Sequence, residues 1–145
     1  MGFLDSLNIS GSGLTAQKYR MEIVAQNLAN ADTTRTEAGG PYRRKLVVLA
    51  EIGSNGTFAQ ALRASVGEAG GGVRVQQVLD DTDDFKVEYD PTHPDANEDG
   101  YVQLPNVDTT QEMVDMMAAS RLYEANVTAF NAMKAMASKA LEIGK

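Results

Sequence analysis

Apolar residues recur at helical spacing near the beginning of the chain. Four of them lie seven residues apart: Leu7, Leu14, Met21 and Leu28. That spacing places them along one side of a helix. Ser10 or Ser12 is suited to capping the start, and Asp32, with threonines and Gly39 after it, to ending the helix. The pattern predicts an amphipathic helix from about residue 11 to residue 31.

The other end of the chain predicts a much longer helix. Thr109 and Glu112 have the spacing of a capping box, and neither proline nor glycine occurs from there to Ile143. One apolar seam consists of Met113, Met116, Tyr123, Val127, Phe130, Ala137 and Leu141. A second seam consists of Val114, Ala118, Leu122, Ala125, Ala129, Met133, Met136, Ala140 and Ile143. A single antiparallel neighbour covers one seam, so the other requires further helices, most simply from neighbouring copies.

Between the two helices the composition changes to glycine, proline, aspartate and β-branched residues. Short strands are predicted at 42–51, 73–79, 85–89 and 101–104, and a mobile loop at 53–72. The predicted fold class is α+β, in which long N- and C-terminal helices form a coiled-coil-like helical domain around a small inserted β-rich middle domain. We divide the chain into an N-terminal helical segment (1–34), a small β-rich outer domain (35–105) and a C-terminal long helix that pairs with the first (106–145).

The charge of the chain is unevenly distributed. The net charge is −7 over 145 residues, and residues 71–105 alone sum to −7, while 1–34 and 106–145 each sum to −1. An acidic chain repels a phosphate backbone, so a nucleic-acid partner is excluded. The longest apolar run, residues 46–50, is far too short for a membrane span, so we expect no direct membrane insertion. The start of the chain shows no cleavable signal peptide. Zero cysteines exclude disulfides and thiolate chemistry.

Motifs for catalysis or metal binding are weak. The segment from Asp95 to Asn106 resembles half of a calcium loop, but its last position holds Asn106 where a bidentate glutamate is needed, so an Asp-Gly turn is the better interpretation. His93 is the only histidine and lies between two prolines, which predicts a rigid turn. The acidic run at 80–84 is typical of solvated surface. We expect no enzyme activity, no metal and no cofactor.

One basic cluster stands out, at residues 43–45. Its simplest role is to protect a strand edge from aggregation. A second hypothesis is that it pairs with the acidic run at 80–84 of the same or a neighbouring copy.

Several segments together resemble one protein family. SGLTAQKYRMEIVAQNLANADTT at residues 12–34 resembles the N-terminal signature of the flagellar rod, hook and hook-associated proteins. PYRRKLVVL (41–49), GGVRV (71–75), DPTHPDANEDGYVQLPNVD (90–108) and EMVDMMAASRLYEANVTAFNAMKAM (112–136) are similar to proximal rod members of that family. The resemblance spans nearly the whole chain.

The resemblance implies a non-enzymatic structural subunit of the proximal rod of the bacterial flagellar basal body. Its terminal helices would pair into the inner tube of the torque-transmitting shaft, with the middle domain facing outward. The implied location is the rod where it crosses the periplasmic space, after export by the flagellar type III apparatus without signal cleavage. The implied partners are other copies, the other proximal and distal rod proteins, the MS-ring adaptor protein and the export apparatus.

Residues on the helix seams and at the asparagine-rich helix end are the predicted assembly interface. They are Leu14, Met21, Val24, Asn27, Leu28, Asn30, Met116, Leu122, Tyr123, Asn126, Val127, Phe130, Met133, Met136 and Leu141. The alternative function is a soluble helical adaptor or secreted binding protein that folds without polymerising. The rod-subunit function and the adaptor function predict different behaviour in solution, because a subunit that lacks its neighbours keeps its ends largely unfolded before assembly.

Overall fold

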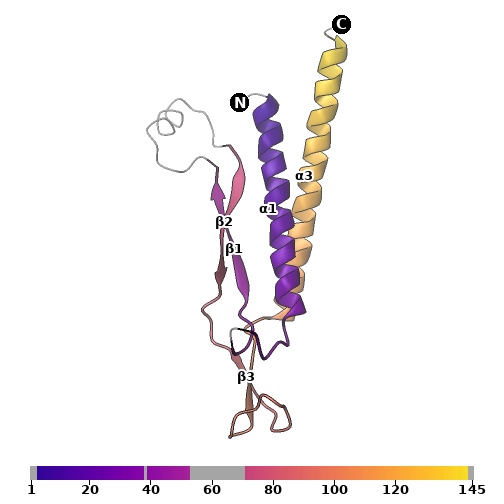
Figure 1. Ribbon diagram of the computed structural model, residues 1–145. Coiled ribbons are helices and arrows are strands. Elements are labelled where there is room, and N and C mark those ends of the chain that lie inside the picture. The colour runs from indigo at the N-terminus through magenta and orange to yellow at the C-terminus, as the bar shows by residue number, and fades with distance from the viewer. Residues whose placement is uncertain (1–2, 38, 53–70, 144–145) are drawn as a thin grey trace, which may run out of the picture.

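Two long helices and a β hairpin lie side by side in the computed structural model, which describes residues 3–37, 39–52 and 71–143 (Figure 1). Helix α1 spans Phe3–Ala29 and helix α3 spans Thr109–Ile143. Helix α1 contacts α3 on one side and strands β1 (Lys45–Glu51) and β2 (Val73–Asp80) on the other. The predicted α+β class, with terminal helices and a strand-rich middle, is confirmed.

Helix α1 begins eight residues earlier than the sequence pattern predicted. The expected caps, Ser10 and Ser12, lie inside the helix, where the Ser12 hydroxyl donates to the carbonyl of Ile9 at 2.7 Å. Gly13 lies inside it too, and a Cβ built there would lie 3.2 Å from Nδ2 of Asn126 on α3. Close packing of the two helices therefore outweighs the poor helix propensity of this serine- and glycine-rich stretch.

Helix α3 has the predicted bounds and is longer than α1. The two helices run antiparallel from a common end, where the side chains of Asn27 and Glu112 are hydrogen-bonded at 3.1 Å. With 35 residues against 27, α3 is longer by about 12 Å at 1.5 Å per residue. Figure 1 shows its C-terminal end projecting past the beginning of α1.

Strands β1 and β2 form an antiparallel hairpin with a register shift between Val48 and Leu49. The hairpin is tied to α1 at its far end, because the amide of Val73 donates to the Ser12 hydroxyl at 3.0 Å. Gly72 next to it has φ +111°, and a Cβ there would overlap Oγ of Ser12. The mobile loop predicted at 53–72 falls, for residues 53–70, outside the described part of the chain.

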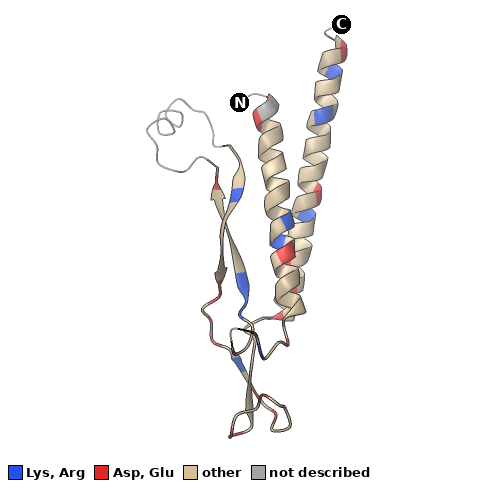
Figure 2. Ribbon diagram, in the orientation of Figure 1, with Lys and Arg blue, Asp and Glu red and all other residues tan. Residues whose placement is uncertain are grey.

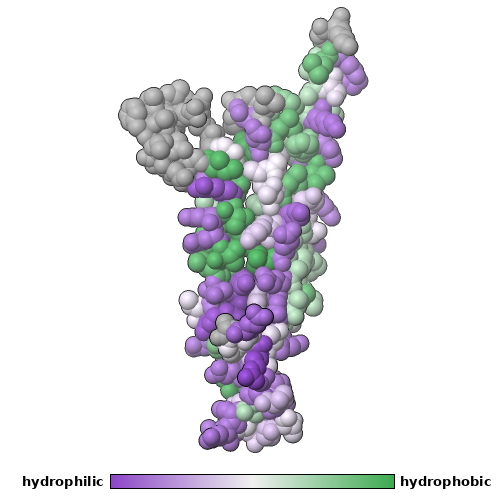
Figure 3. Space-filling model, in the orientation of Figure 1, coloured by the Kyte–Doolittle hydropathy of each residue, from purple (hydrophilic) through white to green (hydrophobic). Residues whose placement is uncertain are grey.

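Strands β3 (Lys86–Tyr89) and β4 (Tyr101–Leu104) form a second antiparallel pair at the end of the molecule away from the free helix ends (Figure 1). Gly100, with φ +81°, closes the turn before β4. Figure 3 shows apolar residues gathered over the helices and the β1–β2 hairpin, and hydrophilic residues over the β3–β4 end. Among the residues that the structure describes, the buried apolar ones are Ala16, Val24, Tyr42, Val102, Val107 and Ala119.

Candidate assembly site

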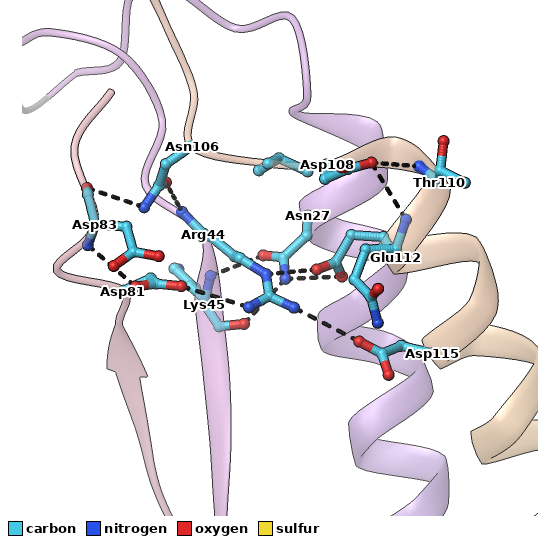
Figure 4. Close-up of polar contacts among 12 residues, drawn as sticks. Asn27, Arg44, Lys45, Asp81, Asp83, Asn106, Asp108, Thr110, Glu112 and Asp115 are labelled. Atoms are coloured by element: carbon cyan, nitrogen blue, oxygen red, sulfur yellow. Dashed lines mark hydrogen bonds and ion pairs between the residues drawn. The ribbon is translucent and has the colours of Figure 1, made fainter. Parts of the chain in front are cut away.

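A buried polar junction joins α1, the segment before β1 and the start of α3 (Figure 4). Asn27, 1% exposed, lies at its centre. Its Oδ1 accepts hydrogen bonds from the Tyr42 hydroxyl at 3.0 Å and the Lys45 amide at 2.9 Å. Its Nδ2 donates to the Lys45 carbonyl at 2.9 Å and to Oε2 of Glu112 at 3.1 Å. Every hydrogen-bonding position of this amide is therefore used inside the chain.

Arg44 is the cation of the same junction. Its Nε donates to Oε1 of Glu112 at 2.6 Å, and Glu112 is 0% exposed. Its two terminal nitrogens lie 3.4 Å from Asp81 and 3.5 Å from Asp115. Asp115 is shared with Arg20 of α1 at 3.4 Å. The guanidinium thus links the β hairpin to the first turn of α3, and the shared carboxylate extends the link to α1.

The electrostatics of the junction follow from this geometry. Burial by itself lowers the pKa of Arg44, but its hydrogen bonds and charge interactions with Glu112 and Asp81 outweigh burial, and the pKa lies above its ordinary value. The pKa of Tyr42 is raised, first by burial and then by the charges of Asp80 and Glu112. Arg44 is therefore held charged and Tyr42 neutral, which is the state that their hydrogen bonds require.

Asp108, not Thr109, caps helix α3. The Asp108 carboxylate accepts hydrogen bonds from the amides of Thr110 at 2.9 Å and Gln111 at 3.3 Å. The predicted capping box of Thr109 and Glu112 is wrong, because the Glu112 side chain points into the junction toward Arg44 and Asn27 (Figure 4). The partly buried Arg44 binds the carboxylate that would otherwise cap the helix.

The basic cluster at 43–45 does meet the acidic run within one chain, although only one of its residues forms an ion pair there. Arg44 pairs with Asp81, as described above. Arg43 instead donates to the backbone carbonyls of Asp81 at 3.0 Å and Asp83 at 3.2 Å. Its guanidinium also stacks 4.3 Å from the centre of the Phe85 ring. The cluster therefore fixes the segment around 81–85 to the junction.

One face of α3 is covered by α1. Buried or half-buried residues recur at alternating spacings of four and three: Glu112, Met116, Ala119, Tyr123, Asn126, Phe130, Met133 and Ala137. This is the heptad spacing of a left-handed helix pair. Of the first predicted seam, Met113 and Leu141 lie outside the covered face, with 52% and 74% exposure. Met113 points elsewhere around the helix, and Leu141 lies beyond the reach of α1.

The second predicted seam of α3 is left almost entirely open. Val114, Leu122, Met136 and Ile143 are 49%, 47%, 62% and 86% exposed, and only Met133 is half-buried. Its alanines are exposed too. An apolar face of this length is larger than a monomer usually leaves in water.

The predicted assembly residues fall into three groups. Val24 and Asn27 are buried inside the chain. Leu122, Met136 and Leu141 are exposed. The remaining ones are half-buried: Leu14, Met21, Leu28, Asn30, Met116, Tyr123, Asn126, Val127, Phe130 and Met133. Sequence reasoning missed the junction that brings Arg44, Glu112 and Asp115 together. It named Arg44 only within the basic cluster and Glu112 only as part of a capping box. Asn106, whose Oδ1 accepts a hydrogen bond from the Arg44 amide at 2.8 Å, was named only as a calcium-loop position that fails.

The calcium-like segment is a turn, as the sequence favoured. Oδ1 of Asn97 accepts from the amides of Asp99 and Tyr101 at 3.1 and 2.8 Å. Asp95 accepts from the Thr34 hydroxyl at 2.7 Å and pairs with Arg35 at 3.8 Å. Among the described residues no group of His, Cys, Asp and Glu is arranged to hold a metal, and no described helix has an apolar stretch suited to crossing a bilayer.

Comparisons with known proteins match both ends of this architecture. A family model described as "Flagella basal body rod protein" matches residues 7–35, which include most of α1. Another, "Flagellar basal body rod FlgEFG protein C-terminal", matches residues 98–143, which include β4 and α3. The paired terminal helices are thus those of the flagellar basal-body rod proteins as a class.

Relatives that match over nearly the full length of the chain identify one family within the basal-body rod proteins. The chain is 54% identical to the flagellar basal-body rod protein FlgC of Bacillus subtilis strain 168, with 97% of each chain covered. It is 43% identical to FlgC of Borreliella burgdorferi (99% and 98% covered) and 42% identical to FlgC of Escherichia coli O6:H1 (100% of both). The chain belongs to the FlgC family of flagellar basal-body rod proteins.

Proposed function

We propose that this chain is a structural subunit of the proximal rod of the bacterial flagellar basal body, and that it assembles through α1 and α3 into the torque-transmitting shaft. The observation that carries the proposal is the open apolar seam of α3, in a chain 54% identical to a basal-body rod protein over 97% of its length. Neighbouring subunits provide the apolar cover that the chain lacks, and interlocked helices make the shaft stiff.

The same support extends to the finer expectations. Residues 1–34 and 106–145 form the shaft, and residues 35–105 form the outer part, held to the shaft by the Arg44 and Asn27 junction. The partners are other copies, the other proximal and distal rod proteins, the MS-ring adaptor protein and the type III export apparatus. The chain acts in the rod between the membranes, reached by export without signal cleavage, and works as a scaffold with no catalytic role.

Replacing seam residues with charge tests this function. In a strain whose own copy carries Leu122→Glu and Met136→Glu, we expect loss of swimming and loss of the chain from purified basal bodies. Ala135→Glu is the matched control, because Ala135 is exposed on α3 but lies outside both seams. Normal basal bodies containing the double variant contradict the proposal.

Solution behaviour separates a rod subunit from the alternative adaptor. The structure has 27 residues in α1 and 35 in α3. We expect circular dichroism of the isolated chain to show far less helix than these two elements contain, because the uncovered seam removes part of the packing that stabilises a long helix. Full helicity in a dilute monomer favours the adaptor.

A further inference from the structure

One end of the molecule, which we call the acidic tip, consists of β3, β4 and the turn between them (residues 86–104). It has five carboxylates against one lysine, which gives −4 with histidine neutral: Glu88, Asp90, Asp95, Glu98 and Asp99. Figure 2 shows acidic residues around the turn at this end, opposite the free ends of the two helices. More than half of the net charge of −7 therefore lies in one short segment.

Interactions within the chain leave most of this charge unbalanced. The only lysine of the acidic tip, Lys86, donates its Nζ to the backbone carbonyl of Val107 at 2.7 Å and not to a carboxylate. Three of the five acidic residues are exposed and, among the residues that the structure describes, form no ion pair: Glu88, Glu98 and Asp99. The tip thus presents a negative field to whatever lies beside it.

The acidic tip also has an exposed apolar face. Val87 and Tyr89 of β3 and Tyr101 of β4 are 63%, 63% and 46% exposed. Register places them on one face, since Tyr89 pairs with Tyr101 and Val87 with Gln103. The two tyrosine rings pack edge to face with their centres 5.2 Å apart, which holds this face rigid. Exposed aromatic rings offer both apolar area and a surface that attracts cations.

A groove of about 840 Å³ runs beside this face. Val87 and Tyr101 form one part of its lining, and Pro41 forms another. The ion-paired side chains of Arg35 and Asp95 also line it, and their pairing at 3.8 Å fixes the wall of the groove. Binding sites commonly have volumes of about 300–1,000 Å³, so the groove has room for several side chains of a partner.

From this combination we infer that the acidic tip binds a basic, partly apolar segment of a different protein in the basal body. The apolar side chains of that segment pack on the face formed by Val87, Tyr89 and Tyr101. Its lysines or arginines lie over the tyrosine rings and beside Glu98 and Asp99. This inference rests on the proposed function, and it names the chemistry of a partner that the outer part of the subunit contacts.

Charge excludes a second copy as the occupant. No helix or strand of the described structure has a net positive charge: α1 contains two cations and two carboxylates, and α3 contains three cations and four carboxylates. The basic cluster at 43–45 is already used, since Arg43 and Arg44 are bound within the chain and Lys45 lies 6.0 Å from the centre of the Tyr42 ring. A membrane surface or a nucleic acid is disfavoured as well, because both present phosphates to the carboxylates of the tip.

Photo-crosslinking in the assembled basal body tests the contact directly. We would replace Tyr89 of the chromosomal copy with the photoreactive amino acid p-benzoylphenylalanine, irradiate intact cells, purify basal bodies and identify the cross-linked peptides by mass spectrometry. We expect one peptide from a different protein, with a net positive charge and with apolar residues beside its cations. The matched control places the same amino acid at Gln77, which is exposed on β2 and should not capture that peptide.

Charge reversal provides a second measurement, in case the photoreactive side chain disturbs the tip. Glu98→Lys with Asp99→Lys should reduce swimming several-fold, and replacing the captured cations of the partner with glutamate should restore it. The matched control is Asp32→Lys with Asp84→Lys, which changes the charge equally at two exposed residues outside the tip and should leave swimming near the original level.

The outcomes separate this contact from the function on which it rests. If the chain carrying no substitution is absent from purified basal bodies, the proposed function is wrong. If the chain is present, a cross-link from position 89 to another copy, to a peptide without positive charge or to no protein overturns the docking inference and leaves the function standing. Normal swimming of the reversed tip, or a reversed tip that no substitution in the captured peptide rescues, overturns it too.

Discussion

Replacing Arg44 with methionine is expected to loosen the junction that joins the β hairpin to both helices. Methionine keeps most of the side-chain volume and removes only the guanidinium. Glu112, whose side chain is 1% exposed, then has one remaining hydrogen-bond donor, Nδ2 of Asn27. Asp115 is less affected, because it retains Arg20.

The expected magnitude follows from burial. Breaking a buried ion pair typically costs about 3–5 kcal/mol, because one charge is left uncompensated. Arg44 is 22% exposed on its side chain, so water reaches part of the site. We therefore expect Arg44→Met to lower the free energy of unfolding by about 3 kcal/mol, at the lower end of that range. Adding Glu112→Gln should recover at least about 1 kcal/mol, because a neutral amide is less costly to bury than a carboxylate.

The assay is circular dichroism at 222 nm across a series from trimethylamine N-oxide to urea. This series reaches both the folded and unfolded baselines, whether or not the isolated chain is stable in buffer. Lys18→Met is the matched control. It breaks the pair with Glu22 at 3.7 Å, which is 68% and 57% exposed, so it should change stability by less than about 1 kcal/mol. Arg44→Met with an effect no larger than Lys18→Met, or no recovery with Glu112→Gln, refutes the reasoning.

Three further predictions concern the helices and the hairpin. Hydrogen bonds from the amides of Gln111 and Thr110 lower the pKa of Asp108 below its usual 3.8. The stability that Asp108 gives to α3 is therefore present at neutral pH, and it is lost as the pH falls below 3.8 through the lowered pKa. Asp108→Asn should still cap α3, but the helix should no longer depend on acid pH in this way. Circular dichroism of helix content against pH tests this, and identical profiles for the original chain and the variant contradict the prediction. Gly72→Ala should detach the β1–β2 hairpin from α1, because residue 72 has φ +111° and its new Cβ would overlap Ser12. The amide of Val73 should then exchange faster with solvent, and an unchanged exchange rate contradicts the prediction. Ala129→Pro should destabilise α3 by about 3 kcal/mol or more and stop rod assembly while residues 35–105 stay folded, and intact rods containing it count against the prediction.

Local pattern was sufficient for the elements with strong periodicity. The absence of proline and glycine from Thr109 to Ile143 set the bounds of α3 correctly. The β-branched and aromatic residues of the middle region located all four strands to within three residues. The start of α1 was predicted wrongly, because Ser10 and Ser12 have the character of helix caps when the local sequence is read in isolation. Only the approach of α3 at Gly13 makes helix the better conformation there.

The two seams of α3 also separate what the sequence predicts from what only the structure shows. The sequence identified an apolar surface too wide for one neighbour, and the structure leaves one seam open along the helix. Which residues face α1 was not predicted fully, since Glu112, Ala119 and Asn126 belong to the covered face but are not large apolar residues. Periodicity counts apolar side chains, whereas packing also uses small residues and hydrogen-bonded polar ones.

By itself, then, the sequence determined the α+β architecture, the acidic middle, the family resemblance and the excess of apolar helix surface, because each depends on composition or on spacing along the chain. Tertiary structure alone decided the junction. Asn27, Arg44 and Glu112 are 17 and 68 residues apart, and nothing in their local context marks them as partners. Their roles arise because burial removes water, so each polar group must find its hydrogen bonds in whichever segment folding brings beside it.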